Sequence, residues 1–140
     1  MTHRSIWIIS LCLPAYGAAL MGGEADLVRY ADTVERESDL AAYWRLEGDL
    51  KDAKGALDGE SGGGRAEFAD GPKAGRALAL AKGRFVTVGG AAALDLPKTT
   101  VELWFKPDFA PNVKYNPCLI AKRSTHAATR FSIHLWHDYS

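Results

Sequence analysis

Neither sign of charge dominates this 140-residue sequence, which has 17 basic and 17 acidic side chains. Proteins that bind nucleic acid or an anionic membrane electrostatically need an excess of Lys and Arg, so the composition favours neither partner. The most apolar run, residues 6–13, covers only eight positions. A helix that spans a membrane needs about 20 apolar residues, which disfavours a membrane anchor.

The sequence also has no familiar catalytic motif. It contains neither Gly-x-Ser-x-Gly nor His-Glu-x-x-His, the patterns of serine hydrolases and zinc peptidases. The glycine run 62–64 is not followed by Lys-Ser or Lys-Thr, so it indicates a flexible turn and not a phosphate-binding loop. The four histidines are scattered, and their spacing predicts no metal site.

The first 19 residues have the order of a secretory signal peptide. Arg4 belongs to a short basic start, residues 6–13 form the apolar run, and small residues continue to Ala19. We expect cleavage near Gly17 or Ala19 and a secreted, periplasmic or cell-surface protein, with no membrane insertion after cleavage.

Cysteine is scarce, with one residue at position 12 and one at position 118. Cys12 lies in the predicted signal peptide, so the mature chain has only Cys118 and forms no internal disulfide. Cys118 lies in the apolar segment 117–121 with no neighbouring base. We therefore expect a buried, inert thiol.

Alternation of apolar and polar residues is the main structural signal. Between residues 100 and 106, Val101, Leu103 and Phe105 alternate with polar positions and Trp104. This period of two predicts a strand with one face on a core, and we expect it to be central in a sandwich.

Six further strands are expected, at residues 41–46, 65–68, 77–80, 85–88, 117–122 and 130–136, and short amphipathic spacing predicts a helix in the lead-in segment 20–40. In the first strand we expect Trp44 and Leu46 on the core side. The connection 81–84 predicts that its two flanking strands form a hairpin. The sequence thus predicts an all-β domain over residues 41–140.

Several of these segments resemble, in order, the strands of laminin-G-like, concanavalin A-like jelly-roll domains. They are AYWRLE at 42–47, GRALAL at 75–80, FVTV at 85–88, TVELWFKP at 100–107, LIAK at 119–122 and FSIHL at 131–135. The resemblance, which runs from about residue 30 to residue 140, implies a sandwich of two antiparallel sheets from an exported, bacterial-type protein. It also implies that the chain covers only the N-terminal part of such a domain, so we expect a truncated, incomplete jelly roll.

The resemblance suggests two binding sites. Many members of the family bind calcium, and Asp52 matches a recurrent family aspartate after the first strand, so Asp49 and Asp52 are candidate calcium ligands; the alternative is a solvated acidic loop. Trp104 and Trp136, with Glu102 and His134 beside them, lie on the outward phase of their strands. Indole rings there can stack on sugars, unless another part of the chain covers them.

These observations favour a non-catalytic recognition module that binds a glycan or an extracellular protein. The alternative is a structural spacer of a larger surface protein or enzyme. A glycoside hydrolase is the third possibility, because glucanases of this fold carry a Glu-x-Asp-x-x-Glu strand. The nearest strings, at residues 24–26 and 37–39, lack the last acid.

Overall fold

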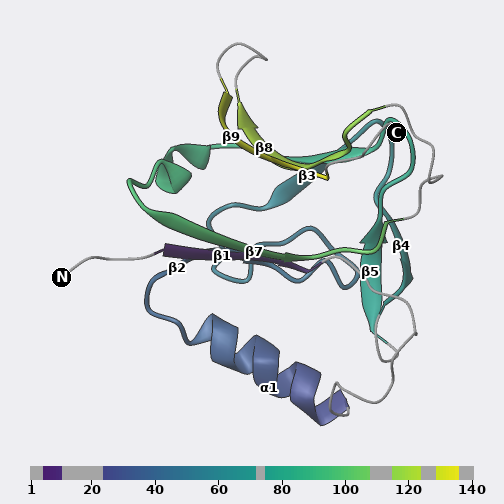
Figure 1. Ribbon diagram of the computed structural model, residues 1–140. Helices are drawn as coiled ribbons and strands as arrows, with labels where there is room; N and C mark the ends of the chain where they lie inside the picture. Colours follow the sequence, from purple (N-terminus) through teal and green to yellow (C-terminus); the bar gives the residue numbers. More distant parts are fainter. Residues whose placement is uncertain (1–4, 11–23, 72–74, 108–114, 124–128, 136–140) are drawn as a thin grey trace. The chain divides into compact units, whose positions relative to one another are not determined.

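The computed structural model describes residues 5–10, 24–71, 75–107, 115–123 and 129–135, without the side chains of residues 5–10, 24–29 and 91 (Figure 1). The chain divides into two compact units, Met1–Lys106 and Pro107–Ser140, and each is considered by itself. The described part is mostly β-structure with one short α-helix, which confirms the all-β class.

The elements follow one another as short strands with brief connections. The first unit contains β1 (Ser5–Ser10), α1 (Glu24–Glu35), β2 (Leu40–Trp44), β3 (Gly59–Gly62), β4 (Glu67–Asp70), β5 (Arg76–Ala79), β6 (Phe85–Val88), the 3-10 helix η2 (Ala91–Leu94) and β7 (Thr99–Trp104). The second unit contains β8 (Cys118–Arg123) and β9 (Thr129–His134). The expected strand at 65–68 begins two residues later, at Glu67.

The largest sheet has the strand order β2-β1-β7, and β1 is parallel to both neighbours. β1 pairs with β7 over six consecutive residues, from Ser5↔Thr99 to Ser10↔Trp104, without an irregularity. The expectation that β7 is central is therefore wrong for the described sheet, in which β7 is an edge strand. The central strand comes from the predicted signal peptide, whose β-branched and aromatic residues favour extended structure.

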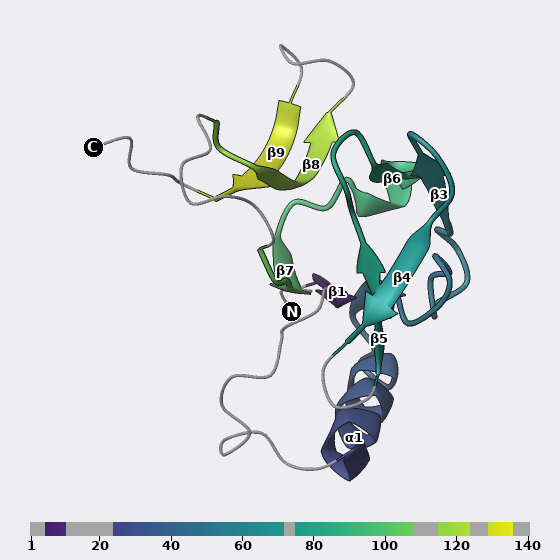
Figure 2. The same cartoon turned by 90° about the vertical axis from the view of Figure 1, so that its right-hand side faces the viewer.

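The hairpin expected from residues 77–88 does not form. β5 pairs with β4, and β6 pairs with β3, both in antiparallel fashion (Figure 2). The intervening turn is present, with Gly83 at φ 78° and a 2.9 Å bond from Arg84 N–H to the Ala81 carbonyl. It therefore leads the chain from one two-stranded sheet to the next instead of folding it back on itself.

Helix α1 begins where the lead-in segment predicts a helix and lies along one face of the three-stranded sheet (Figure 1). Its end at Glu35 is followed by turns that lead into β2 at Leu40. Val34, Leu40 and Tyr43 form a buried cluster, against which the half-buried Tyr30 packs. Among the described residues, no helix is both long and apolar enough to cross a membrane.

Strand β2 is buried on both faces. Trp44 is 5% exposed and Leu46 is 4% exposed, which confirms the predicted core positions. Tyr43, on the opposite phase, is also buried at 3%. The strand ends at Trp44, and Leu46 has a left-handed φ of 56°.

In the second unit, β8 and β9 form an antiparallel pair. The predicted outward phase of His134 is confirmed, because His134 and Ser132 are exposed while Phe131 and Ile133 are half-buried. The prediction of a buried thiol is wrong, since Cys118 is free and exposed. Cys118 is the first residue of β8, and β9 is the one strand that the structure describes beside β8. The apolar residues next to Cys118 in the sequence therefore do not cover its thiol.

Close approach of the turns that flank β3 and β6 gives a first prediction. Gly55 and Gly63 both have left-handed φ values, of 80° and 74°, but a Cβ atom is free of contacts at Gly55 and meets the Gly83 carbonyl at Gly63. We expect Gly55→Ala to lower the free energy of unfolding by about 1 kcal/mol, and Gly63→Ala by about 3 kcal/mol or more. Chemical denaturation measures the free energy of unfolding of both variants. Equal losses would contradict the close approach of Gly63 to the Gly83 carbonyl.

Candidate functional site

The predicted sugar-binding residues Glu102 and Trp104 lie together on β7, but they bond to each other and to α1. The Tyr30 hydroxyl donates to Glu102 Oε1 at 2.5 Å, and the Trp104 indole N–H donates to the same oxygen at 3.1 Å. All three side chains are half-buried. Helix α1 therefore covers part of the face that the sequence predicted to be open, and Glu102 is engaged in holding the helix to the sheet.

Of the other two predicted sugar-binding residues, one lies in the second unit and one lies outside the described residues. His134 is exposed in the second unit, where its Nδ1 lies 3.2 Å from the Asn116 carbonyl oxygen. Trp136 lies outside the described residues. Sugar binding by all four residues together stays a prediction.

Burial changes the acidity of two tyrosines in the first unit. It raises the pKa of Tyr30 to about 12, and the hydrogen bond to Glu102 acts in the same direction. A phenolate there would lose its bond and face a carboxylate, so the neutral phenol is favoured. Burial also raises the pKa of Tyr43 above its usual value.

Asp52 organises the loop that follows β2. Its carboxylate is 3% exposed and accepts four backbone N–H groups. Oδ1 accepts from Tyr43 at 2.8 Å and Lys54 at 3.0 Å, and Oδ2 accepts from Ala56 at 3.3 Å and Leu57 at 3.2 Å. Both oxygens are thus satisfied by the main chain, which is how a buried carboxylate avoids a large desolvation cost.

Further bonds close the same loop. The Asp52 carbonyl accepts from Gly55 N–H at 2.7 Å, and the Asp52 N–H donates to Asp58 Oδ1 at 2.9 Å. The Trp44 indole N–H donates to the Leu57 carbonyl at 2.7 Å. The Asp-x-x-Gly string at 52–55 therefore encodes a turn whose glycine takes a left-handed φ.

The two candidate calcium ligands have different surroundings. Asp49 is exposed and accepts one N–H, from Lys51 at 3.1 Å, whereas Asp52 is buried with four N–H partners. Calcium is bound by six to eight oxygens, and the described residues include no group of three or more His, Cys, Asp or Glu side chains able to hold a metal. Calcium binding at this loop stays a prediction, and the geometry gives Asp52 a structural role.

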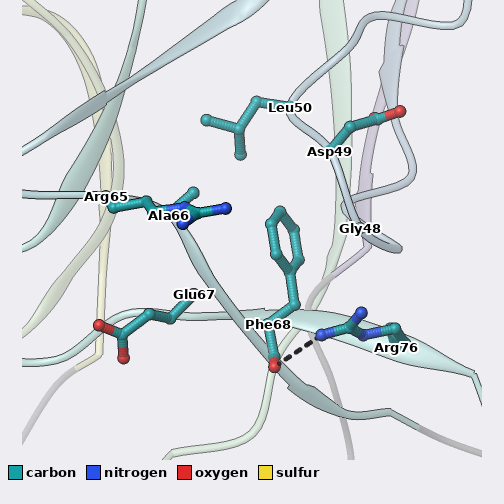
Figure 3. A pocket seen from close by; sticks show the side chains of 8 residues that line it. All are labelled: Gly48, Asp49, Leu50, Arg65, Ala66, Glu67, Phe68 and Arg76. Carbon is teal, nitrogen blue, oxygen red and sulfur yellow. Dashed lines mark hydrogen bonds between the residues drawn. The ribbon is translucent and has the colours of Figure 1, made fainter.

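A pocket of about 530 Å³ lies beside this loop (Figure 3). It is lined by Gly48, Asp49, Leu50, Arg65, Ala66, Glu67, Phe68 and Arg76. The ring of Phe68 stands among these side chains in Figure 3, half-buried and pointing toward Leu50. Arg76 donates to the Phe68 carbonyl at 3.1 Å, and its guanidinium carbon lies 5.8 Å from the ring centroid.

One wall of the pocket is braced from outside by Arg84. Its guanidinium pairs with Glu67 Oε1 at 3.0 Å and donates to the Arg65 carbonyl. A second hollow of about 310 Å³ shares Gly48 and Asp49 with the pocket. The exposed Asp49 carboxylate thus borders both hollows.

Sequence reasoning did not find this pocket. Phe68 was expected only as the last residue of the strand 65–68. Arg76 directly precedes the strand expected at 77–80, whose predicted hairpin does not form. The two meet because β4 pairs with β5, with Asp70 opposite Arg76. No local pattern signals that pairing, since residues 70–76 could also lead into an unpaired strand.

Comparison with known proteins adds no relative: no family model, curated protein or solved structure matches this chain.

The carboxylate of Asp52 should contribute more to the free energy of unfolding than any other acidic side chain of its loop. Asp52→Ala leaves four N–H donors without an acceptor, two of them in buried surroundings, and each unsatisfied buried donor costs about 1–3 kcal/mol. We expect the free energy of unfolding to fall by about 3 kcal/mol or more. The matched control Asp49→Ala removes one exposed acceptor and should cost about 0.5 kcal/mol. Similar losses for both variants would contradict the described role.

The raised pKa of Tyr30 predicts a high-pH effect with a definite sign. The folded-state pKa of Tyr30, about 12, lies above the ordinary tyrosine pKa of about 10. The phenol therefore contributes its full stability below pH 10, and the contribution is lost as the pH rises through 12. Absorbance titration of the native chain minus that of Tyr30→Phe should isolate a phenol that ionises near pH 12. A step near pH 10 in this difference curve would show that Tyr30 is not held by Glu102.

Proposed function

We propose that this chain is a non-catalytic recognition module that binds carbohydrate in the pocket around Phe68. The observation that supports the proposal is the make-up of this pocket, in which a half-buried aromatic ring lies among exposed carboxylate and guanidinium groups. Sugars present apolar C–H faces and hydroxyl edges at the same time. The aromatic ring suits the first, and charged hydrogen-bonding groups suit the second.

The size of the site agrees with a small saccharide. A volume of about 530 Å³ lies within the usual range of about 300–1,000 Å³ for ligand pockets. The neighbouring hollow, which shares Gly48 and Asp49, gives a longer chain of sugar units a place to continue. Asp49 is then the side chain positioned to contact two successive units.

Two further parts of the proposal concern the fold and the location. We infer a jelly-roll sandwich, which the antiparallel pairs β3–β6, β4–β5 and β8–β9 support. The sheet β2-β1-β7 departs from the expected antiparallel arrangement, because β1 runs parallel to both of its neighbours. The signal-peptide pattern at residues 1–19 supports export, where extracellular glycans are available as ligands.

Affinity electrophoresis of the purified chain through gels that contain soluble β-glucan, xylan or mannan tests the proposal. We expect at least one polysaccharide to retard migration, and titration calorimetry with its oligosaccharide then gives the affinity. Asp49→Asn keeps the acceptor for Lys51 N–H but removes the charge, and should weaken binding about tenfold, as the loss of a charge-assisted hydrogen bond does.

Asp58→Asn is the matched control, because Asp58 is also exposed and accepts a backbone N–H but does not line the pocket. It should bind with native affinity. If no polysaccharide retards the chain, the recognition role is wrong and the structural spacer is favoured. If Asp49→Asn and Asp58→Asn weaken binding equally, the site lies elsewhere.

A further inference from the structure

The central strand of the parallel sheet comes from a segment with the pattern of a signal peptide. In the described sheet β1 is the one strand that contacts both β2 and β7, and no pairing joins β2 to β7 directly. Taking β1 away leaves a gap one strand wide. The backbone groups on both sides of that gap then have no partner, which makes it a template for another strand.

The backbone of β2 shows which of its groups face this gap. Tyr43 N–H donates to Asp52 Oδ1, and the Tyr43 carbonyl accepts from Ala53 N–H at 2.8 Å, so Tyr43 faces the loop. Successive residues of a strand direct these groups to opposite sides, so those of Ala42 and Trp44 face β1. Their partners in the register are Trp7 and Ile9.

The gap is formed from residues that are otherwise fixed. One side of β2 is held by the Asp52 loop, and Ala42 and Trp44 are 0% and 5% exposed. β7 is held to α1 through the bond between Tyr30 and Glu102. Both edges are thus anchored by contacts that do not involve β1.

The geometry points to a strand-binding site between β2 and β7, which takes an extended apolar peptide segment by pairing with both of its edges. Ser5–Ser10 occupies the site in this chain. Removal of the segment during export would open the same site to an apolar strand of another polypeptide. Main-chain hydrogen bonds would supply the affinity, as in other cases of strand addition. This inference is independent of carbohydrate binding, which concerns the pocket beside β4 and β5.

Hydrogen exchange on the full chain tests the site. The double variant Trp7→Pro, Ile8→Pro removes two backbone N–H groups of β1, one that faces β2 and one that faces β7. Proline is also not accommodated in a central strand. We expect exchange at Ala42 and Trp44 to accelerate about a hundredfold or more, while Tyr43, which faces the loop, keeps its protection. Ser5→Pro is the control, since the first residue of a strand tolerates proline.

A synthetic peptide of residues 3–11 with a lysine tail, added to the double-proline chain, should restore protection at Ala42 and Trp44. The same peptide with N-methylated amides at Trp7 and Ile8 should not. Failure of the unmodified peptide to restore protection, with Tyr43 still protected, would overturn the inference. So would native Ala42 and Trp44 amides that exchange as fast as those of the double-proline chain.

Disulfide trapping gives a second measurement if the double-proline chain does not fold. With Cys12 and Cys118 replaced by serine, Trp7→Cys should form a disulfide with Val101→Cys, its register partner. It should not form one with Thr100→Cys, because a shift of one residue reverses the side of the sheet. Equal trapping of both pairs, or trapping of neither, would contradict a register-specific site.

Discussion

A single buried carboxylate fixes the part of the fold on which both proposed sites depend. Asp52 collects the backbone N–H groups of Tyr43, Lys54, Ala56 and Leu57, so a loop with no regular secondary structure still satisfies its donors. Aspartate is rarely buried unless it is paired or hydrogen-bonded. Here the cost of burial is offset because each oxygen accepts two N–H groups, and the loop is held in one conformation.

This constraint reaches the pocket and the strand-binding site through short connections. The Gly59 N–H donates to the Leu50 carbonyl at 2.7 Å, which joins the two ends of the loop where β3 begins. Leu50 is also a wall of the Phe68 pocket. On its other side the loop holds Tyr43, and therefore β2, in the orientation that turns Ala42 toward β1. The two sites are thus built on opposite sides of one anchored strand.

Local pattern predicted the elements of this fold better than their pairing. The alternation of residues 130–135 and the burial of Trp44 and Leu46 follow from nearest neighbours in sequence. The partners of β5 and β6 do not, since a turn of the same geometry can fold a chain back or lead it to another sheet. The exposure of Cys118 depends likewise on which strands flank β8.

The candidate sites show the same boundary. The Asp-x-x-Gly string at residues 52–55 was visible in the sequence. Carboxylate oxygens accept N–H groups as readily as they bind calcium, so only the folded structure shows that Asp52 accepts backbone N–H groups. The hydrogen bond of Glu102 to Tyr30 joins residues 72 positions apart, beyond any local pattern.

Hydrogen exchange at Lys54 and Ala56 tests the anchoring role of Asp52 most directly, because these exposed loop residues donate N–H groups to the Asp52 carboxylate. We predict that they exchange as slowly as Tyr43, whereas Lys51, whose N–H donates to the exposed Asp49, exchanges fast. Lys54 and Ala56 amides that exchange as fast as the Lys51 amide would contradict an anchoring role for Asp52.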